Sequence, residues 1–222
     1  MSFNNKGMII VFEGLDGSGK ETQSKLLEKR LNSIGIKATR MEFPDYNNKY
    51  SLFVKEYLKG DFGKCVDPYV VSMFFALDRF GMYKKVMSKY LEEGYIIICD
   101  RYVYSNLIYQ GSKIKNQESR NEFFNWVLDF EYNKCGLEKE EITFFMDVPI
   151  DISLDILKQR EEKDIHEEDE EFLRECYKNC KYIVSKYNLV NVDCSSNSKL
   201  RSIDEISDYL YDHVIKILHS RG

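Results

Sequence analysis

The sequence has few of the residues that interrupt a chain or cross-link it. Its 222 residues include three prolines, 12 glycines and six scattered cysteines. So little proline and glycine excludes collagen-like and low-complexity chains. Six scattered cysteines are too sparse for the disulfide scaffold of a small secreted protein. We therefore expect reduced thiols and a compact fold, for which 43% hydrophobic residues are sufficient.

Long apolar runs and an excess of basic charge are also missing. The longest apolar run, 95–99, is far too short to cross a bilayer, and the first residues lack the charged start and apolar stretch of a signal peptide. We expect no membrane partner and a cytoplasmic location. With 37 acidic against 32 basic side chains, the net charge of −5 provides no global field for a nucleic-acid backbone. Any phosphate binding must therefore be local.

Apolar, β-rich segments alternate with helical patterns along the whole chain. The strand-like segments are 8–13, 37–43, 95–99, 142–148 and 189–193. The helical patterns are 22–35, 67–93, 118–132, 150–162, 167–187 and 203–218. This alternation predicts an α/β fold in three layers, a five-stranded parallel sheet flanked by helices, as a single domain over 1–222. Ligands of such sheets bind at the carboxyl ends of the strands.

The segment Gly14–Lys20, which reads GLDGSGK, lies between the first strand and the first helix. In the pattern G-x-x-x-x-G-K, glycines let backbone N–H groups surround phosphate oxygens, and the lysine reaches the terminal phosphates. The alternative is a tight turn without a ligand, but Lys20 and the flanking elements favour nucleotide binding. The predicted ATP-binding residues are Gly14, Leu15, Asp16, Gly17, Ser18, Gly19, Lys20, Glu21 and Thr22.

One position of this phosphate loop departs from the usual pattern. Glu21 follows Lys20 where a Ser or Thr usually contacts magnesium, and the first hydroxyl is that of Thr22. The carboxylates of Asp16 and Asp100 are therefore the candidate magnesium ligands, because Mg²⁺ takes oxygen ligands and keeps several waters. An ordinary ion pair between Asp100 and Arg101 at a strand end is the alternative.

Four segments follow one another in an order and spacing typical of one enzyme family. They are the phosphate loop, FPDY at 43–46, FFALDR at 74–79 and DRYVYSNLIYQG at 100–111. Through these motifs the chain resembles the thymidylate (dTMP) kinases over nearly its whole length. The resemblance implies a P-loop kinase fold with a short lid. It also implies transfer of the γ-phosphoryl group of ATP to dTMP, giving dTDP and ADP, with Mg²⁺ and usually as a homodimer.

The same resemblance assigns roles on the acceptor side. Arg79 and Arg101 are expected to hold the dTMP phosphate. Phe75 is expected to stack on the base, with a place in the core as the alternative, and Asn106 to reach the base edge. Tyr109 would close over the sugar. The implied acceptor residues are Phe43, Pro44, Tyr46, Leu58, Phe75, Arg79, Arg101, Ser105, Asn106, Tyr109 and Gln110. The implied catalytic residues are Lys20, Arg101, Asp16 and Arg160.

The resemblance also implies a lid at about 159–171. Members whose phosphate loop lacks an arginine are expected to supply one from the lid, and Gly17 stands where some relatives have arginine. Arg160 is then the candidate that points at the ATP phosphates. A solvated charged linker is the alternative, because eight carboxylates crowd the segment. We expect His166 to be a surface residue of the lid, because an acceptor phosphate needs no general base.

Two other functions fit parts of the pattern. Another P-loop nucleotide or deoxynucleoside kinase also uses an acidic residue and an arginine at a strand end. A monophosphate acceptor, however, requires two cations, which Arg79 and Arg101 supply. A non-catalytic nucleotide-binding module does not require Lys20, Asp100 and Arg101 together, although fold alone does not decide function. We therefore expect a dTMP kinase.

Overall fold

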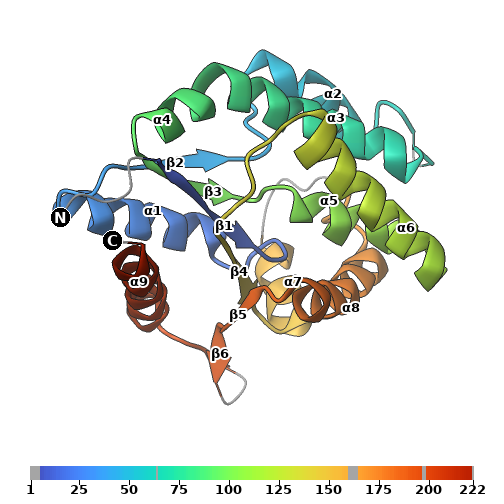
Figure 1. The fold of residues 1–222 in the computed structure, drawn as a ribbon. Coiled ribbons are helices and arrows are strands. Elements are labelled where there is room, and N and C mark those ends of the chain that lie inside the picture. Colours follow the sequence, from blue (N-terminus) through green and yellow to red (C-terminus); the bar gives the residue numbers. More distant parts are fainter. Residues whose placement is uncertain (1–5, 64, 160–164, 197–198, 222) are drawn as a thin grey trace.

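A five-stranded sheet lies at the centre of the computed structural model, which describes residues 6–63, 65–159, 165–196 and 199–221 (Figure 1). Across the sheet the strands are β2 (Ala38–Glu42), β3 (Ile96–Asp100), β1 (Met8–Glu13), β4 (Ile142–Asp147) and β5 (Val190–Asp193). All four neighbouring pairs are parallel. The predicted parallel sheet and its five strands are therefore confirmed.

Helices connect the strands and cover both faces of the sheet. They are α1 (Lys20–Ser33), α2 (Leu52–Lys59), α3 (Pro68–Met82), α4 (Ser88–Glu92), α5 (Tyr104–Tyr109), α6 (Gln117–Leu128), α7 (Ile150–Lys158), α8 (Glu170–Tyr187) and α9 (Ile203–Ser220). Short 3-10 turns span Lys49–Ser51 and Gly111–Lys113, and a minor ladder pairs β6 (Ser195–Ser196) with β7 (Lys199–Leu200). No helix in the described ranges has an apolar stretch long enough to cross a membrane.

Two of the predicted helices contain π-helical turns. The pattern 67–93 forms α3, the π-turn η2 (Tyr83–Met87) and α4 in succession, and α6 continues into the π-turn η4 (Asp129–Lys134). Such turns are frequent at functional sites, because the extra residue changes the direction of the side chains. The helices α2 and α5 were not predicted, since eight and six residues are too few to show a helical period.

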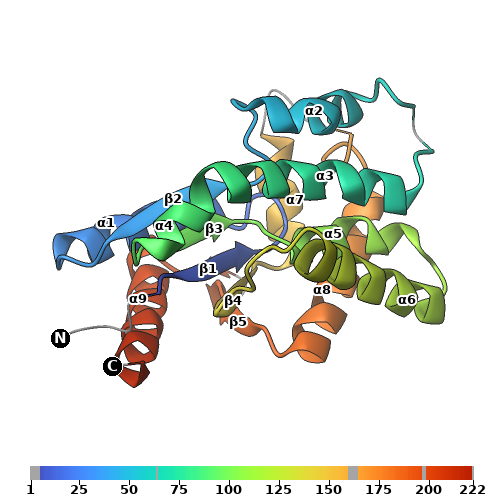
Figure 2. The same ribbon diagram turned by 45° about the horizontal axis from the view of Figure 1, so that its top comes forward.

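Helices pack on both faces of the sheet, and successive side chains of a strand point into the opposite faces. Ile9 and Val11 of β1 pack on one side in a cluster that also includes residues of α5, α6 and α8. Ile10 and Phe12 pack on the other side against α1 and α9. A third, smaller cluster lies between α2 and α3. Figure 2 shows α2 resting on α3, apart from the sheet.

Every strand of the sheet ends in a carboxylate. The final residues are Glu13, Glu42, Asp100, Asp147 and Asp193. Parallel strands bring these ends to one edge of the sheet, where the loop between β1 and α1 also opens. The polar edge of the sheet and the phosphate loop therefore lie together.

Candidate active site

The phosphate loop has a backbone that only glycine permits at its first position. Gly14 has φ 147°, and a Cβ there would lie 2.8 Å from Ser18 Oγ and 2.9 Å from the carbonyl oxygen of Met146. Gly19 adopts the left-handed conformation, φ 82°, directly before α1. The Lys20 ammonium turns back into the loop and donates to the Leu15 carbonyl at 2.7 Å and to Ser18 Oγ at 3.3 Å. The loop is thus closed by its own lysine.

The charge of Lys20 is poorly solvated. Its side chain is buried, and burial together with the Arg101 guanidinium lowers the pKa of Lys20 to about 8. Asp16 and Asp100 act in the opposite direction and raise the pKa. An anion bound in the loop would favour the ammonium form further, since opposite charges stabilise each other at short range.

Arg101 connects the phosphate loop to the acceptor side. Its backbone is left-handed, φ 69°, which costs a non-glycine residue roughly 1–2 kcal/mol. Its N–H donates to the Phe12 carbonyl at 2.9 Å. The guanidinium donates to the Gly14 carbonyl at 3.2 Å and forms an ion pair with Asp16, whose other oxygen accepts from Tyr109 Oη at 2.8 Å. Backbone strain here is offset by contacts that aim the side chain at the loop.

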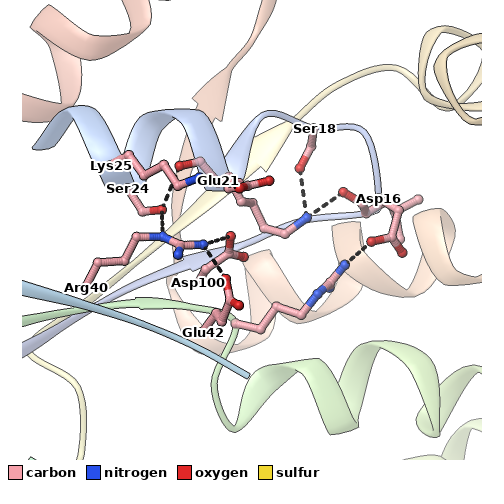
Figure 3. A network of polar contacts seen from close by, with 11 residues as sticks. Asp16, Ser18, Glu21, Ser24, Lys25, Arg40, Glu42 and Asp100 are labelled. Atoms are coloured by element: carbon pink, nitrogen blue, oxygen red, sulfur yellow. Dashed lines mark hydrogen bonds and ion pairs between the residues drawn. The ribbon is translucent and has the colours of Figure 1, made fainter. Parts of the chain in front are cut away.

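Asp100 pairs with an arginine that the sequence did not single out. Arg40 of β2 lies 3.1 Å from Asp100 and 2.9 Å from Glu42, and its Nε donates to Ser24 Oγ at 2.8 Å (Figure 3). The ion pair between Asp100 and Arg101 that stood as the alternative is therefore not the one formed. Neighbouring parallel strands in register bring Arg40 to the end of β3, because Glu42 is aligned with Asp100.

A donor cavity opens in front of the phosphate loop. It is lined by Asp16, Gly17, Gly19, Lys20, Glu21, Thr22, Glu42, Phe43, Pro44, Tyr46, Asp100, Arg101 and Glu167. The remaining predicted ATP residues, Gly14, Leu15 and Ser18, shape the loop from behind. The described part of the chain contains no group of three His, Cys, Asp or Glu side chains that could hold a metal ion. Asp16 and Asp100 both line this cavity, and Mg²⁺ commonly takes one or two carboxylates plus substrate phosphates, so their role as its ligands stays a prediction.

An acceptor cavity adjoins the donor cavity. It is lined by Asp16, Phe43, Pro44, Tyr46, Leu58, Phe75, Arg79, Arg101, Ser105, Asn106, Tyr109, Gln110 and His166. Every acceptor residue expected from the sequence therefore borders one space, although each binding role stays a prediction. Asp16 and Arg101 line both cavities, so the two spaces meet at this ion pair.

Arg79 lines the acceptor cavity but, unlike Arg101, is not among the described residues that line the donor cavity. It is 1% exposed and donates from Nε and Nη2 to the two oxygens of Glu131, at 2.5 and 2.7 Å. Asn106 Nδ2 donates to the same carboxylate at 2.8 Å. Of the two arginines, only Arg101 is among the described residues that line the donor cavity. Arg79 is thus placed with Asn106, the residue expected at the base edge.

Glu13 is a buried carboxylate that sequence reasoning missed. It accepts from the Tyr102 N–H at 2.9 Å and from Ser105 Oγ at 2.7 Å, and burial raises its pKa. These bonds hold the turn that follows Arg101. The available signal was a carboxylate at the end of an otherwise apolar strand, directly before the phosphate loop, because a buried carboxylate needs partners.

His166 is not the surface residue that we expected. It is 7% exposed, lies 3.2 Å from Tyr57 Oη through Nε2, and packs its ring on Phe172 and Tyr109. Burial lowers its pKa to about 3, so the imidazole is neutral. The expectation was wrong because aromatic rings from α2, α5 and α8 meet around this position. Arg160 lies outside the described residues.

A phosphate loop at the start of a parallel sheet, beside an acceptor cavity lined by cations, defines a P-loop phosphotransferase. The sequence profile of the thymidylate kinase family matches residues 12–205 of the chain. The chain therefore belongs to the thymidylate kinase family. This confirms the resemblance and the P-loop kinase fold predicted from the sequence.

Individual relatives agree with this assignment. The thymidylate kinase of Plasmodium falciparum is 27% identical over 212 residues, covering 96% of this chain and 91% of that protein. The probable thymidylate kinase of Methanocaldococcus jannaschii is 30% identical over 203 residues, covering 91% and 95%. The solved structure of thymidylate kinase from Candida albicans shares the fold, with a TM-score of 0.73, 23% identity and coverage of 95% and 92%.

Proposed function

We propose that the two adjoining cavities transfer the γ-phosphoryl group of ATP to dTMP, giving dTDP and ADP. Membership of the thymidylate kinase family indicates an ATP-dependent dTMP kinase, and nothing favours another nucleotide or deoxynucleoside kinase. The observation that carries the proposal is the acceptor cavity, which gathers the expected acceptor residues and meets the phosphate loop at Arg101 and Asp16.

On the donor side, the loop N–H groups and Lys20 bind the ATP phosphates. Asp16 and Asp100 are the carboxylates that would hold Mg²⁺, directly or through water; when bound, the ion neutralises phosphate charge. Positioning and charge neutralisation are most of what phosphoryl transfer requires from a protein. The strained, doubly anchored Arg101 suits this task, because its guanidinium is fixed before the substrates arrive.

On the acceptor side, Arg101 binds the dTMP phosphate, since it borders both cavities. Phe75 stacks on the base and Tyr109 covers the sugar. We assign Arg79 to the base edge beside Asn106 instead of to the phosphate, because its partner Glu131 holds it there. His166 closes the wall of the cavity next to Tyr109.

The lid arginine is tested by substitution. Arg160→Ala is expected to slow phosphoryl transfer by about a thousandfold, as removal of a positioned arginine commonly does. Lys163→Ala serves as the comparison. If neither variant slows transfer appreciably, the lid-arginine proposal is wrong.

A coupled assay of ADP release tests the function itself. Mg-ATP is offered with dTMP, dUMP, dCMP, dGMP, AMP or thymidine as separate acceptors. We expect turnover mainly on dTMP. Turnover on thymidine without dTMP would instead indicate a deoxynucleoside kinase, and ATP binding without turnover on any acceptor would indicate a non-catalytic module.

We also propose that the chain forms a homodimer through α2 and α3. These helices and the loop between them carry a group of apolar side chains that are 37–56% exposed: Leu52, Phe53, Phe62, Val70 and Leu77. Several large apolar side chains exposed on one pair of helices are typical of an interaction site. Leu77→Glu should sediment as a monomer, whereas Ile34→Glu, an exposed position on the far side of the sheet, should not change the species observed.

The cytoplasmic location stays a prediction.

A further inference from the structure

Glu131 does not line the acceptor cavity itself but contacts two residues that do, Arg79 and Asn106, and no motif singled it out. Its side chain is 0% exposed and comes from the π-turn η4 that follows α6. It accepts two hydrogen bonds from Arg79 of α3 and one from Asn106 of α5. One carboxylate therefore joins three elements that are far apart in the sequence.

The contacts of Glu131 decide which atoms its two partners offer to a ligand. The pair with Arg79 uses Nε–H and one hydrogen of Nη2, so the Nη1 group and the second Nη2 hydrogen are the remaining hydrogen-bond donors of that guanidinium. The amide nitrogen of Asn106 donates to Glu131 at 2.8 Å and to the Ser72 carbonyl at 3.1 Å. Both amide hydrogens are then used, so the amide oxygen of Asn106 is left as an acceptor.

A donor from Arg79 beside an acceptor from Asn106 matches one class of pyrimidine. Thymine and uracil carry an acceptor oxygen, O4, next to a donor, N3–H. Cytosine carries the reverse, an amino donor at C4 next to the acceptor N3. A site built to hydrogen-bond one pattern leaves buried polar groups unpaired when the other pattern enters.

We propose that Glu131 is a positioning residue that sets this donor and acceptor pattern, so that the site selects thymine and uracil over cytosine. The proposal builds on the proposed function, in which the acceptor is dTMP. Glu131 touches no substrate and acts through Arg79 and Asn106. It also gives the buried guanidinium of Arg79 an opposite charge in contact, which a buried charge requires.

Glu131→Gln is the decisive variant. The glutamine has the same shape, but its amide nitrogen would face a donor of Arg79 or Asn106, so the carboxylate geometry is lost. We expect KM for dTMP to rise about tenfold or more and the preference for dTMP over dCMP, as a ratio of kcat/KM, to fall at least about tenfold. KM for ATP should stay within about twofold, because Glu131 lies outside the donor cavity.

The control is Asp129→Asn in the same π-turn. Asp129 is a half-exposed carboxylate that pairs with Lys134, and its removal should change neither KM nor the acceptor ratio. Glu131→Asp is a second, milder variant in case Glu131→Gln does not fold. It keeps a carboxylate beside Arg79, but its shorter side chain weakens the hydrogen bond with Asn106. We expect it to lower the ratio by about threefold.

The outcomes separate this inference from the proposed function. If the wild type does not phosphorylate dTMP, the proposed function is wrong. If the wild type prefers dTMP and a folded Glu131→Gln keeps the preference within about twofold, the inference is overturned and the ion pair is only structural. Should Glu131→Gln fail to fold, Glu131→Asp decides in the same way: a lowered ratio supports the inference, and an unchanged ratio overturns it.

Discussion

The phosphate loop and the acceptor cavity are built in opposite ways. The loop uses consecutive residues, 14–22, and Lys20 closes it through Leu15 and Ser18 a few positions away. The acceptor cavity takes its residues from the phosphate loop, from the ends of β2 and β3, from α2, α3 and α5, and from the segment before α8. A local motif therefore encodes the phosphate loop, whereas the acceptor cavity exists only after distant elements have packed together.

The two regions also differ in how their charges are compensated. Lys20 is a buried cation whose lowered pKa of about 8 shows that its surroundings do not fully balance it. Arg79 has a complete partner in Glu131, and burial keeps His166 neutral. An anion would therefore stabilise the charge of Lys20 on the donor side, whereas the charge of Arg79 on the acceptor side is already compensated by Glu131.

The largest effect should come from breaking the donor side alone. Lys20→Met is expected to lower kcat by about a thousandfold or more, because a positioned cation on the transferred phosphate is lost. Affinity for dTMP should stay within about twofold if the acceptor side is preorganised. A coupled kinase assay and calorimetric titration of dTMP measure the two quantities. An equal loss of dTMP affinity would show that the regions are not independent.

The second test measures how protein stability depends on pH through His166, which lines the acceptor cavity. Burial holds His166 neutral, whereas in the unfolded chain it takes up a proton below its ordinary pKa of 6.5. The unfolded state then binds more protons, so stability is complete above pH 6.5 and falls as the pH drops toward the folded pKa of about 3. Between about pH 6.5 and 5 this contribution loses about 2 kcal/mol.

Chemical denaturation at both pH values measures that loss. The wild type should lose about 2 kcal/mol more than His166→Gln, which cannot take up the proton. His213 on α9 packs against Phe144 away from the site, so His213→Gln is the matched control and should follow the wild type. An equal acid sensitivity of the wild type and His166→Gln would refute the role of a buried neutral imidazole.

The smallest effect should come from a single wall of the acceptor cavity. Phe75→Ala is expected to raise KM for dTMP about tenfold, since stacking of a base on an aromatic ring contributes roughly 1–3 kcal/mol. Phe74→Ala, the neighbouring position, should leave KM unchanged, because Phe74 packs on Phe53 and Phe62 and is not among the described residues of the cavity wall. Similar increases for both variants would mean that Phe75 acts through packing.

Much of the fold followed from apolar patterning. The central strands β1, β3 and β4 were predicted because buried parallel strands are nearly continuous apolar runs. The edge strands β2 and β5 are less apolar and only partly buried, but turn residues bound them, so they were predicted too. The short helices α2 and α5 were not predicted, and α2 contributes Leu58 and Tyr57 to the surroundings of the site. Their positions depend on packing against α3 and α8, which a short sequence window does not contain.

The functional residues divide in the same way. Lys20, Arg101, Phe75 and Asn106 stand in motifs, so their place at one site could be predicted. Arg40, Glu13, Glu131 and His166 lie in stretches that resemble ordinary solvated or strand-end sequence. Their burial and their partners, such as Asp100 for Arg40, are visible only in the folded molecule.

By itself, the sequence determined the parallel sheet, the phosphate loop and the family, because each depends on spacing within a short stretch of chain. The tertiary structure alone decided that Arg79 and Asn106 share the carboxylate of Glu131 and that His166 is buried and neutral. The physical reason is that the ionisation and orientation of a polar side chain depend on what surrounds it after packing, and those neighbours come from distant parts of the chain.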